Sequence, residues 1–427
     1  MLALRRLPVV ADMTLVTAGA MTANVAGYLL QLLAGRWLGV SGYSEFASLL
    51  AVQLLAAVPA LALQNVVARE LVRGAAGATV RRLTRRCAFI VAVVAIALIP
   101  VVAVVLHVNA VAAGGALLAA PVLVLISGEQ GILQGDQQFR RLAAVLGGVA
   151  ILRVTPAVIL LAAGGDAGVA LWGAALGLVV AAAGARRITG ALGPVTGADR
   201  ARESGAAAPA SGPARAADVA AVLRAAQVQA ALMALSSADL IIARIVLDDV
   251  DASRYALGAI ATKIAFWLPQ AVGVVLYPRM AQPQHSVRAL RSALAVLAVI
   301  GAVAVAGAAV LSPLAPLFAG NDYAPIEGWL WLFALDGALL AVLQGALLSA
   351  IAADRTAPAA VIWAGLAVEL AVTLPFVRSL PVLIAIATGI AAVATTLVVA
   401  VVIRGVHRDR APESGRGAGR LSPLPGD

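Results

Sequence analysis

Long apolar stretches, each followed by a short polar segment, run along almost the whole chain. A helix needs about 20 apolar residues to span a bilayer, and twelve stretches come close to that length. The pattern therefore predicts an all-α polytopic membrane protein with about twelve transmembrane helices. The expected spans lie near residues 13–35, 44–66, 88–107, 112–134, 142–163, 167–185, 219–247, 254–277, 292–311, 327–352, 358–377 and 381–403.

The arginines are concentrated in alternate gaps between these spans. An excess of basic residues marks cytoplasmic loops, so the alternation predicts a multi-pass protein of the inner (plasma) membrane with both termini in the cytoplasm. Arg36, Arg254 and Arg378 are exceptions on the opposite side. The basic gaps hold Arg5, Arg6, Arg69, Arg73, Arg81, Arg82, Arg85, Arg86, Arg140, Arg141, Arg186, Arg187, Arg200, Arg202, Arg215, Arg279, Arg288, Arg291 and Arg355.

Two segments are rich in small and polar residues and lack apolar periodicity. Residues 189–218 have the composition of a flexible cytoplasmic linker. Residues 406–427 have that of a disordered basic tail, which is either solvated or lies against anionic lipid. We therefore expect an N-terminal six-helix lobe over residues 1–188 and a C-terminal six-helix lobe over residues 219–405.

The two halves also resemble each other at a common spacing. Leu-Gln-Gly at 133–135 recurs 210 residues later at 343–345, and Tyr255 follows Tyr43 by 212 residues. Because each half has an even number of spans, a duplicated half keeps its orientation, which predicts a parallel repeat about an axis along the membrane normal. Transporters with such repeats commonly bind substrate between the halves.

Composition supports the membrane interpretation and excludes several functions. The chain is 62% hydrophobic and 12% charged, whereas soluble proteins carry roughly 25% charged residues. The net charge of +10 resides mostly in the loop arginines, so no nucleic-acid partner is expected. Cys87 is the single cysteine, and the three histidines are scattered. We therefore expect no metal, no cofactor and no catalytic residue, and the chain is not predicted to be an enzyme.

The stretch 236–280 places ionisable residues inside two apolar segments. An acidic turn with Asp248, Asp249 and Asp251 joins them. At about 1.5 Å per helical residue, Asp239 lies roughly 13 Å from this turn, and Lys263 lies a similar distance down the second helix. Charges within a bilayer are costly and usually have partners or face watery cavities. The two residues are therefore expected to meet at one depth.

Three stretches carry a resemblance to a known family. LLAGRWLGVSGYSEFASLL at 32–50, GILQGDQQFRRLAAV at 131–145 and the stretch 236–280 resemble the Wzx-like polysaccharide flippases. These belong to the superfamily of MATE antiporters and oligosaccharide-lipid and polysaccharide exporters. The resemblance implies two pseudo-symmetric six-helix lobes around a central cavity, which carries a polyprenyl-diphosphate-linked saccharide to the outer leaflet by alternating access. Implied partners are this glycan, the lipid bilayer, and a glycan polymerase or glycosyltransferases.

A diphosphate and a sugar need a cationic, water-filled cleft to cross the hydrocarbon. Guanidinium groups suit a diphosphate because their donors can bond two oxygens at once. For the two cations nearest the helix ends, the alternative is that the long side chain extends to the interface. The candidate substrate-binding residues are Arg153, Lys263, Arg244 and Arg224, and the last two are those nearest the ends.

Three acids lie at comparable depths: Asp239, Asp336 and Glu369. Asp239 is either the structural partner of Lys263 or a titrating group that couples transport to ions. Asp336 and Glu369 have no basic neighbour in the sequence, so each is either a coupling group or part of a contact that holds the lobe together.

Two other functions remain open. A MATE-like ion-coupled small-molecule or drug antiporter would share the fold but would favour an acidic or aromatic cavity. A non-transporting membrane scaffold would use the linker and the arginine-rich loop as docking sites. A membrane-embedded glycosyltransferase or polymerase is disfavoured, because the loops on the outer side are short.

Overall fold

The computed structural model describes residues 6–190, 216–280, 286–352 and 357–408, all of them helical or in short turns. Each of the twelve expected spans falls on one helix or on two consecutive helices, so the all-α polytopic fold is confirmed. The first half contains α1 (Arg6–Ala56), α2 (Val58–Val72), α3 (Gly77–Val105), α4 (Ala110–Leu117), α5 (Ala119–Gly135), α6 (Phe139–Ala162) and α7 (Ala167–Gly190).

The second half follows the same order with extra short turns. It contains α9 (Ala216–Val246), α10 (Asp249–Met280), α11 (Ser286–Leu311), η2 (Ser312–Leu314), α12 (Ala315–Ala319), η3 (Asn321–Trp329), α13 (Leu330–Ala352), α14 (Ala357–Phe376) and α15 (Leu380–Arg408). The segment expected as a linker, 189–218, begins and ends in helix, because α7 continues to Gly190 and α9 starts at Ala216. Its centre and the tail beyond residue 408 lie outside the described residues.

The first two expected spans are joined by a kink instead of a loop. Gly39 has φ 65° and ψ −176°, a backbone conformation that favours glycine, and it divides α1 into two spans. The second span is interrupted again between α1 and α2, where Pro59 lies in the first turn of α2 and has no N–H to donate to the helix. The polypeptide can therefore reverse direction at Gly39 without a polar loop.

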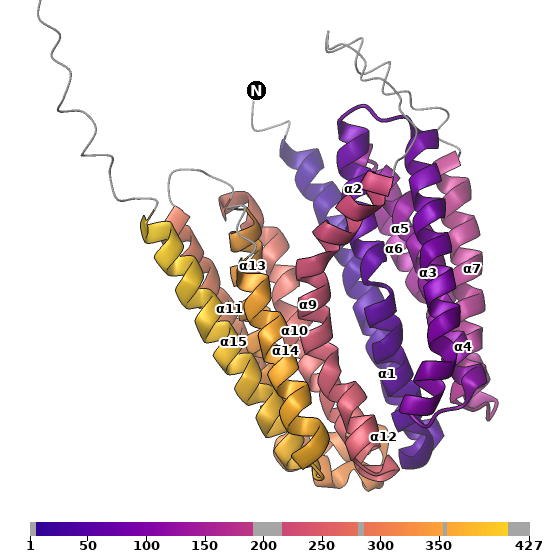
Figure 1. Ribbon diagram of the computed structural model, residues 1–427, viewed down its shortest axis with the longest axis vertical. Coiled ribbons are helices and arrows are strands. Elements are labelled where there is room, and N and C mark those ends of the chain that lie inside the picture. The colour runs from indigo at the N-terminus through magenta and orange to yellow at the C-terminus, as the bar shows by residue number, and fades with distance from the viewer. Residues whose placement is uncertain (1–5, 191–215, 281–285, 353–356, 409–427) are drawn as a thin grey trace, which may run out of the picture.

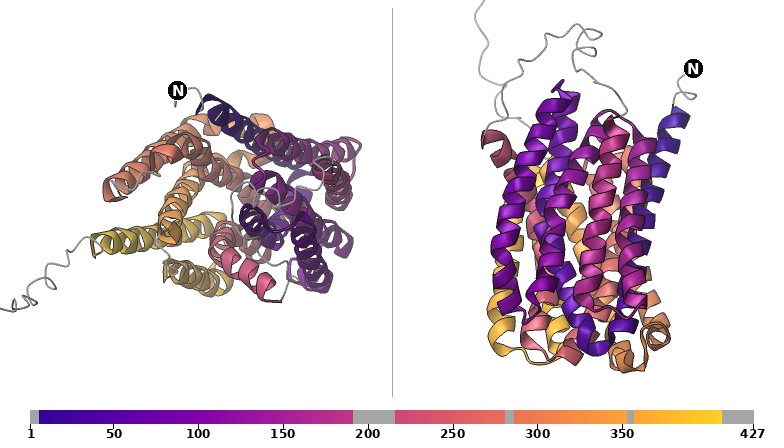
Figure 2. Two further views of the ribbon diagram at one scale, coloured as in Figure 1. Left: turned by 90° about the horizontal axis from the view of Figure 1, so that it is seen from above. Right: turned by 90° about the vertical axis from the view of Figure 1, so that its right-hand side faces the viewer.

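The two halves form two lobes that lie side by side (Figures 1 and 2). Within the first lobe α6 packs on α7 and on α1, and within the second α13 packs on α10, α11 and α15. The lobes meet mainly where α1 lies against α9 and α10. We use the term outer end for the end of the molecule that holds Gly39 and the α9–α10 turn, after the orientation that the arginine pattern predicts.

Close helix packing within each lobe depends on glycine. A Cβ at Gly177 of α7 would lie 1.8 Å from the carbonyl oxygen of Leu152 in α6, and one at Gly337 of α13 would lie 2.0 Å from that of Thr262 in α10. Any larger residue at either position would force the two helices apart. Small residues at helix contacts are the usual means of close approach within membranes.

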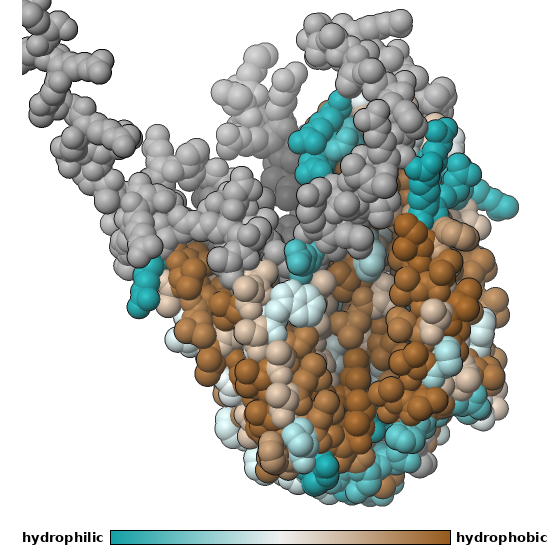
Figure 3. Space-filling view, viewed as in Figure 1, coloured by the Kyte–Doolittle hydropathy of each residue, from teal (hydrophilic) through white to brown (hydrophobic). Residues whose placement is uncertain are grey.

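The surface has the polarity of a membrane protein. Nine helices or helix pairs in the described ranges are long and apolar enough to cross a bilayer. The visible face is hydrophobic over its middle and polar at the outer end (Figure 3). The helices α3 and α11 turn most of their apolar side chains outward, since only 11% and 6% of their spans are buried. That exposure is what a lipid-facing helix requires.

Candidate functional site

Two cations from opposite lobes both lie against helix α1, where the lobes meet. Arg153 lies on α6 of the first lobe and Lys263 on α10 of the second, both partly buried, and their charges interact. Nη2 of Arg153 donates a hydrogen bond of 3.1 Å to Oε1 of Gln53 on α1. Its Nε is buried without a partner. No ion pair forms at either cation among the described residues.

Helix α1 connects the two cations structurally. Its Gln53 holds Arg153, and the hydroxyl of its Tyr28 donates a 3.2 Å hydrogen bond to the backbone carbonyl of Lys263. The two bonds lie on opposite sides of the Gly39 kink, so both spans of α1 contribute. The arrangement gives the cations a defined position at the lobe contact without neutralising their charge.

Three acids gather inside the second lobe. Asp239 of α9, Asp336 of α13 and Glu369 of α14 are each 4% exposed or less, and the charge of Asp239 interacts with both of the others. Asp239 accepts a 2.8 Å hydrogen bond from the hydroxyl of Tyr255 on α10. Oε1 of Glu369 is buried without a partner. Within the described ranges, no three His, Cys, Asp or Glu side chains converge in a way that would hold a metal ion.

The expected meeting of Asp239 and Lys263 is realised only at longer range. Their charges interact, but the two side chains form no ion pair, and both are described. The carboxylate of Asp239 is instead bonded to Tyr255, one helix away. Lys263 therefore lies between an acid cluster in its own lobe and Arg153 in the other.

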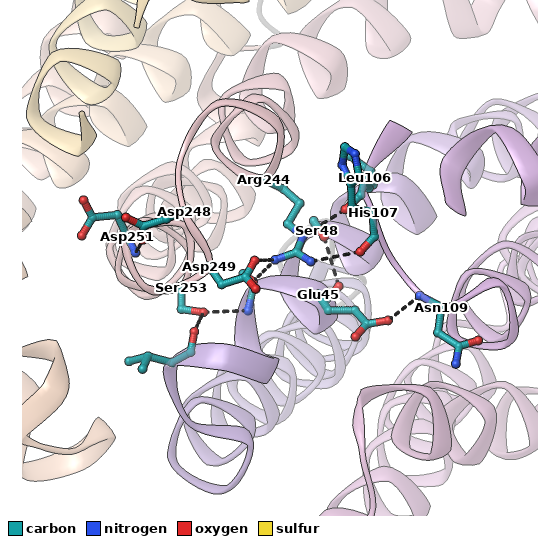
Figure 4. A network of polar contacts seen from close by, with 12 residues as sticks. Glu45, Ser48, Leu106, His107, Asn109, Arg244, Asp248, Asp249, Asp251 and Ser253 are labelled. Atoms are coloured by element: carbon teal, nitrogen blue, oxygen red, sulfur yellow. Dashed lines mark hydrogen bonds and ion pairs between the residues drawn. The ribbon is translucent and has the colours of Figure 1, made fainter. Parts of the chain in front are cut away.

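Of the other two candidate cations, Arg244 lies apart from Arg153 and Lys263. Arg244 lies in the last turn of α9 at the outer end, where it bonds the first lobe (Figure 4). Arg224 lies near the beginning of α9, and its side chain is outside the described residues.

This chain resembles known proteins in its fold and not in its sequence. No protein-family model and no curated protein sequence matches this chain. Solved structures do match over nearly its whole length. An inward-facing multidrug resistance MATE family transporter of the MOP superfamily is 15% identical, with a TM-score of 0.62 over 90% of this chain and 96% of that one. The lipid II flippase MurJ, in an inward closed conformation, is 13% identical, with a TM-score of 0.68 over 92% and 87%.

The chain has the MOP transporter fold. A further neighbour with this fold is a MOP superfamily transporter from Pyrococcus furiosus, in which the reverse polarity of the binding pocket suggests a different function. It is 13% identical, with a TM-score of 0.55 over 93% of this chain and 95% of that one. At these identities the likeness establishes the fold, and the chemistry of the site has to be argued from the residues of this chain.

Sequence reasoning missed several polar residues of this MOP fold. Gln53 was missed because it lies within an apolar stretch, and Tyr255 was noted only as a marker of the internal repeat. Glu129 was missed although it is an acid within the expected span 112–134, the same pattern that singled out Asp239. It is 8% exposed and is bonded by Arg81, Arg186 and Thr189 at the inner end of the first lobe.

Proposed function

We propose that this protein is a flippase that moves a polyprenyl-diphosphate-linked saccharide from the cytoplasmic to the outer leaflet by alternating access between its two lobes. The observation that carries the proposal is that Arg153 and Lys263, partly buried cations of opposite lobes without ion pairs among the described residues, both lie against helix α1 at the lobe contact. Two like charges repel each other in surroundings of low polarity. A diphosphate between them would turn that repulsion into attraction on both sides.

The geometry suits an anion that passes between lobes. Because Arg153 belongs to the first lobe and Lys263 to the second, a relative movement of the lobes would change the distance between the cations. A diphosphate held by both would therefore be bound differently in each state, which is what a carrier requires. The prenyl chain can stay in the bilayer throughout, so only the head group needs the polar route.

The experiment measures flipping in proteoliposomes. A polyprenyl diphosphate bearing a fluorescently labelled saccharide is incorporated, and an impermeant reductant quenches label that reaches the external leaflet. We expect Arg153→Gln and Lys263→Gln each to reduce the rate about tenfold, because a charge-assisted hydrogen bond is worth about 1.5–3 kcal/mol. The double variant should fall to the rate of empty vesicles.

Two controls make the result specific to the charge. Arg153→Lys and Lys263→Arg keep the positive charges and should retain most of the activity. Arg254→Gln removes an arginine that bonds only within the second lobe, to Asp251 and to the backbone of Asp322, and should leave the rate unchanged. If the Arg153→Gln/Lys263→Gln double variant is correctly inserted and still flips the lipid at the parental rate, the cationic site is refuted.

A MATE-like ion-coupled antiporter is the second candidate, and the acid cluster favours it. Asp239, Asp336 and Glu369 form a buried acidic group within one lobe, as proton-coupled or ion-coupled export would require. Its test is efflux of a cationic dye against a proton gradient, measured for the parent and for Asp239→Asn. Gradient-driven dye efflux that needs Asp239, together with absent lipid flipping, would replace the flippase by the antiporter.

The proposed orientation in the membrane and the proposed partners follow from the sequence. With the arginine-rich ends of the helices in the cytoplasm, both termini and the segment between the lobes lie on the inner face of the plasma membrane. A glycan polymerase or glycosyltransferases would then act before and after transport. If the third possibility, a non-transporting scaffold, were correct, the charge variants above would be harmless and deletion of residues 190–215 would not.

A further inference from the structure

Four arginines lie at the outer end, where the arginine pattern predicts few. Each donates to at least one backbone carbonyl: Arg254 to Asp322, Arg378 to Leu374 and Val377, Arg36 to Leu317, and Arg244 to Leu106 and His107. Arg254 and Arg378 bond only their own lobe. Arg36 and Arg244 instead bond the opposite lobe.

Of these two arginines, Arg244 makes more hydrogen bonds to the opposite lobe (Figure 4). Its side chain is 9% exposed. Nε donates to the carbonyl of Leu106 at 3.1 Å, Nη2 to that of His107 at 3.3 Å, and Nη1 to the hydroxyl of Ser44 at 2.6 Å, all in the first lobe. Asp249, which follows on α10, pairs with the same guanidinium from its own lobe. The guanidinium therefore fills the space between α9, α3 and α1.

Arg36 repeats the contact in the opposite direction. Its Nη1 lies 3.5 Å from the carbonyl of Leu317 in the second lobe. Arg244 follows Arg36 by 208 residues and Leu317 follows His107 by 210, which is the spacing of the internal repeat. In each lobe an arginine at the end of the first span thus reaches the backbone at the end of the third span of the other lobe.

A further contact between the lobes involves Ser44, which Arg244 also bonds. The amide of Ser44 donates a 2.8 Å hydrogen bond to the hydroxyl of Ser253, 209 residues later, and that hydroxyl donates to the carbonyl of Val40. Residues one repeat apart touch each other only near the axis that relates the repeats. The two arginines therefore flank the pseudo-twofold axis at the outer end.

We propose that Arg36 and Arg244 form a reciprocal latch that holds the two lobes together at the outer end and has to be released for the outward-facing state. This inference rests on the proposed alternating access and not on the identity of the cargo. The latch is unequal, because Arg244 is buried and makes three bonds across the contact, whereas Arg36 is exposed and makes one long bond. Arg244 should therefore dominate the equilibrium.

The test measures access to the lobe contact beneath the latch. Leu257 of α10 is 5% exposed, and its Cδ1 faces Gly35 of the opposite lobe. In a Cys87→Ser background, Leu257→Cys gives a smaller reporter thiol that an impermeant maleimide reaches only when the lobes separate. Labelling is followed in membranes, with reagent supplied to each side in turn. No substrate is needed, so a failure of the latch is distinguishable from a failure of the proposed cargo.

We expect Arg244→Gln to raise the labelling rate from the outer side about tenfold, as expected for the loss of a charge-assisted hydrogen bond between two states. Arg36→Gln should raise it about twofold, because an exposed charge contact is weak. Arg254→Gln is the matched control, since it removes an outer arginine with bonds inside one lobe only, and it should label at the parental rate.

A second pair of variants covers the case in which Arg244→Gln does not reach the membrane. Ser44→Cys with Ser253→Cys, in the Cys87→Ser background and without the Leu257→Cys reporter, should cross-link under oxidation, lose transport while cross-linked and regain it on reduction. Equal labelling of the Arg244→Gln and Arg254→Gln variants would overturn the latch. So would unimpaired transport by the fully cross-linked protein.

Discussion

The first lobe neutralises its buried Glu129, and the second lobe leaves Asp239, Asp336 and Glu369 without ion pairs among the described residues. Glu129 of α5 is bonded by Arg81 of α3 at 3.5 Å and by Arg186 of α7 at 2.9 Å, and the hydroxyl of Thr189 donates to it as well. These contacts connect three helices at the inner end. In the first lobe the buried charge therefore serves packing.

The acids of the second lobe are arranged differently. Asp239, Asp336 and Glu369 interact with one another, and among the described residues none of them forms an ion pair. The hydroxyl of Tyr255 donates a hydrogen bond to Asp239. Unpaired buried acids cost stability, so their presence in one lobe and absence from the equivalent lobe indicates a role beyond packing. We therefore expect the first cluster to contribute to stability and propose a role in transport for the second.

The largest expected effect is the loss of stability on breaking the first cluster. Glu129→Gln would leave Arg81 and Arg186 without their carboxylate and should lower the free energy of unfolding by about 2 kcal/mol, less than for a fully buried pair because Arg186 is more than half exposed. Thermal unfolding in detergent measures this. Asp336→Asn, the matched variant in the second lobe, removes a buried acid that has no ion pair among the described residues and should not lower the free energy of unfolding. If both variants lost the same stability, the proposed difference between the two clusters would be wrong.

The next effect is on transport and concerns the second cluster. Asp239→Asn keeps the shape of the side chain but removes the ionisable group, and it should reduce gradient-driven transport about tenfold if this acid couples to ions. Transport driven by the substrate gradient alone should change little. Initial rates with and without a proton gradient separate the two. An equal reduction under both conditions would assign Asp239 to structure.

The smallest effect is expected for Tyr255→Phe. This variant removes only the hydroxyl that bonds Asp239, a contribution of about 1 kcal/mol, and should alter the gradient-driven rate about fivefold or less. The ring remains packed edge-on against Phe333, so the melting temperature should stay near that of the parent. A large drop in melting temperature with an unchanged rate would show that the hydroxyl serves packing.

Much of the fold could be predicted from the sequence, because bilayer thickness fixes the length of each apolar stretch. The repeat could be found from the recurring Leu-Gln-Gly, and it is consistent with the contact between Ser44 and Ser253. The kink at Gly39 could not be found, since a short turn within a long apolar region leaves little trace in hydropathy.

The partners of the charged residues were less predictable than their depth. Helical rise placed Asp239 and Lys263 at one level, but helix rotation decides which side chains meet, and Asp239 bonds Tyr255. Arg244 was expected among the substrate-binding cations, and its place in the outer contact depends on α3 of the other lobe. Such contacts between lobes leave no periodic pattern in either segment alone.

The central claim is that Arg153 and Lys263 together bind a diphosphate between the lobes. Its most direct measurement is the affinity of purified protein for a polyprenyl diphosphate, compared between the parent, the Arg153→Gln/Lys263→Gln double variant and Arg254→Gln. We predict that the double variant binds at least about tenfold more weakly, that Arg254→Gln binds like the parent, and that the parent prefers the diphosphate to the monophosphate. Parental affinity in the double variant would contradict the account.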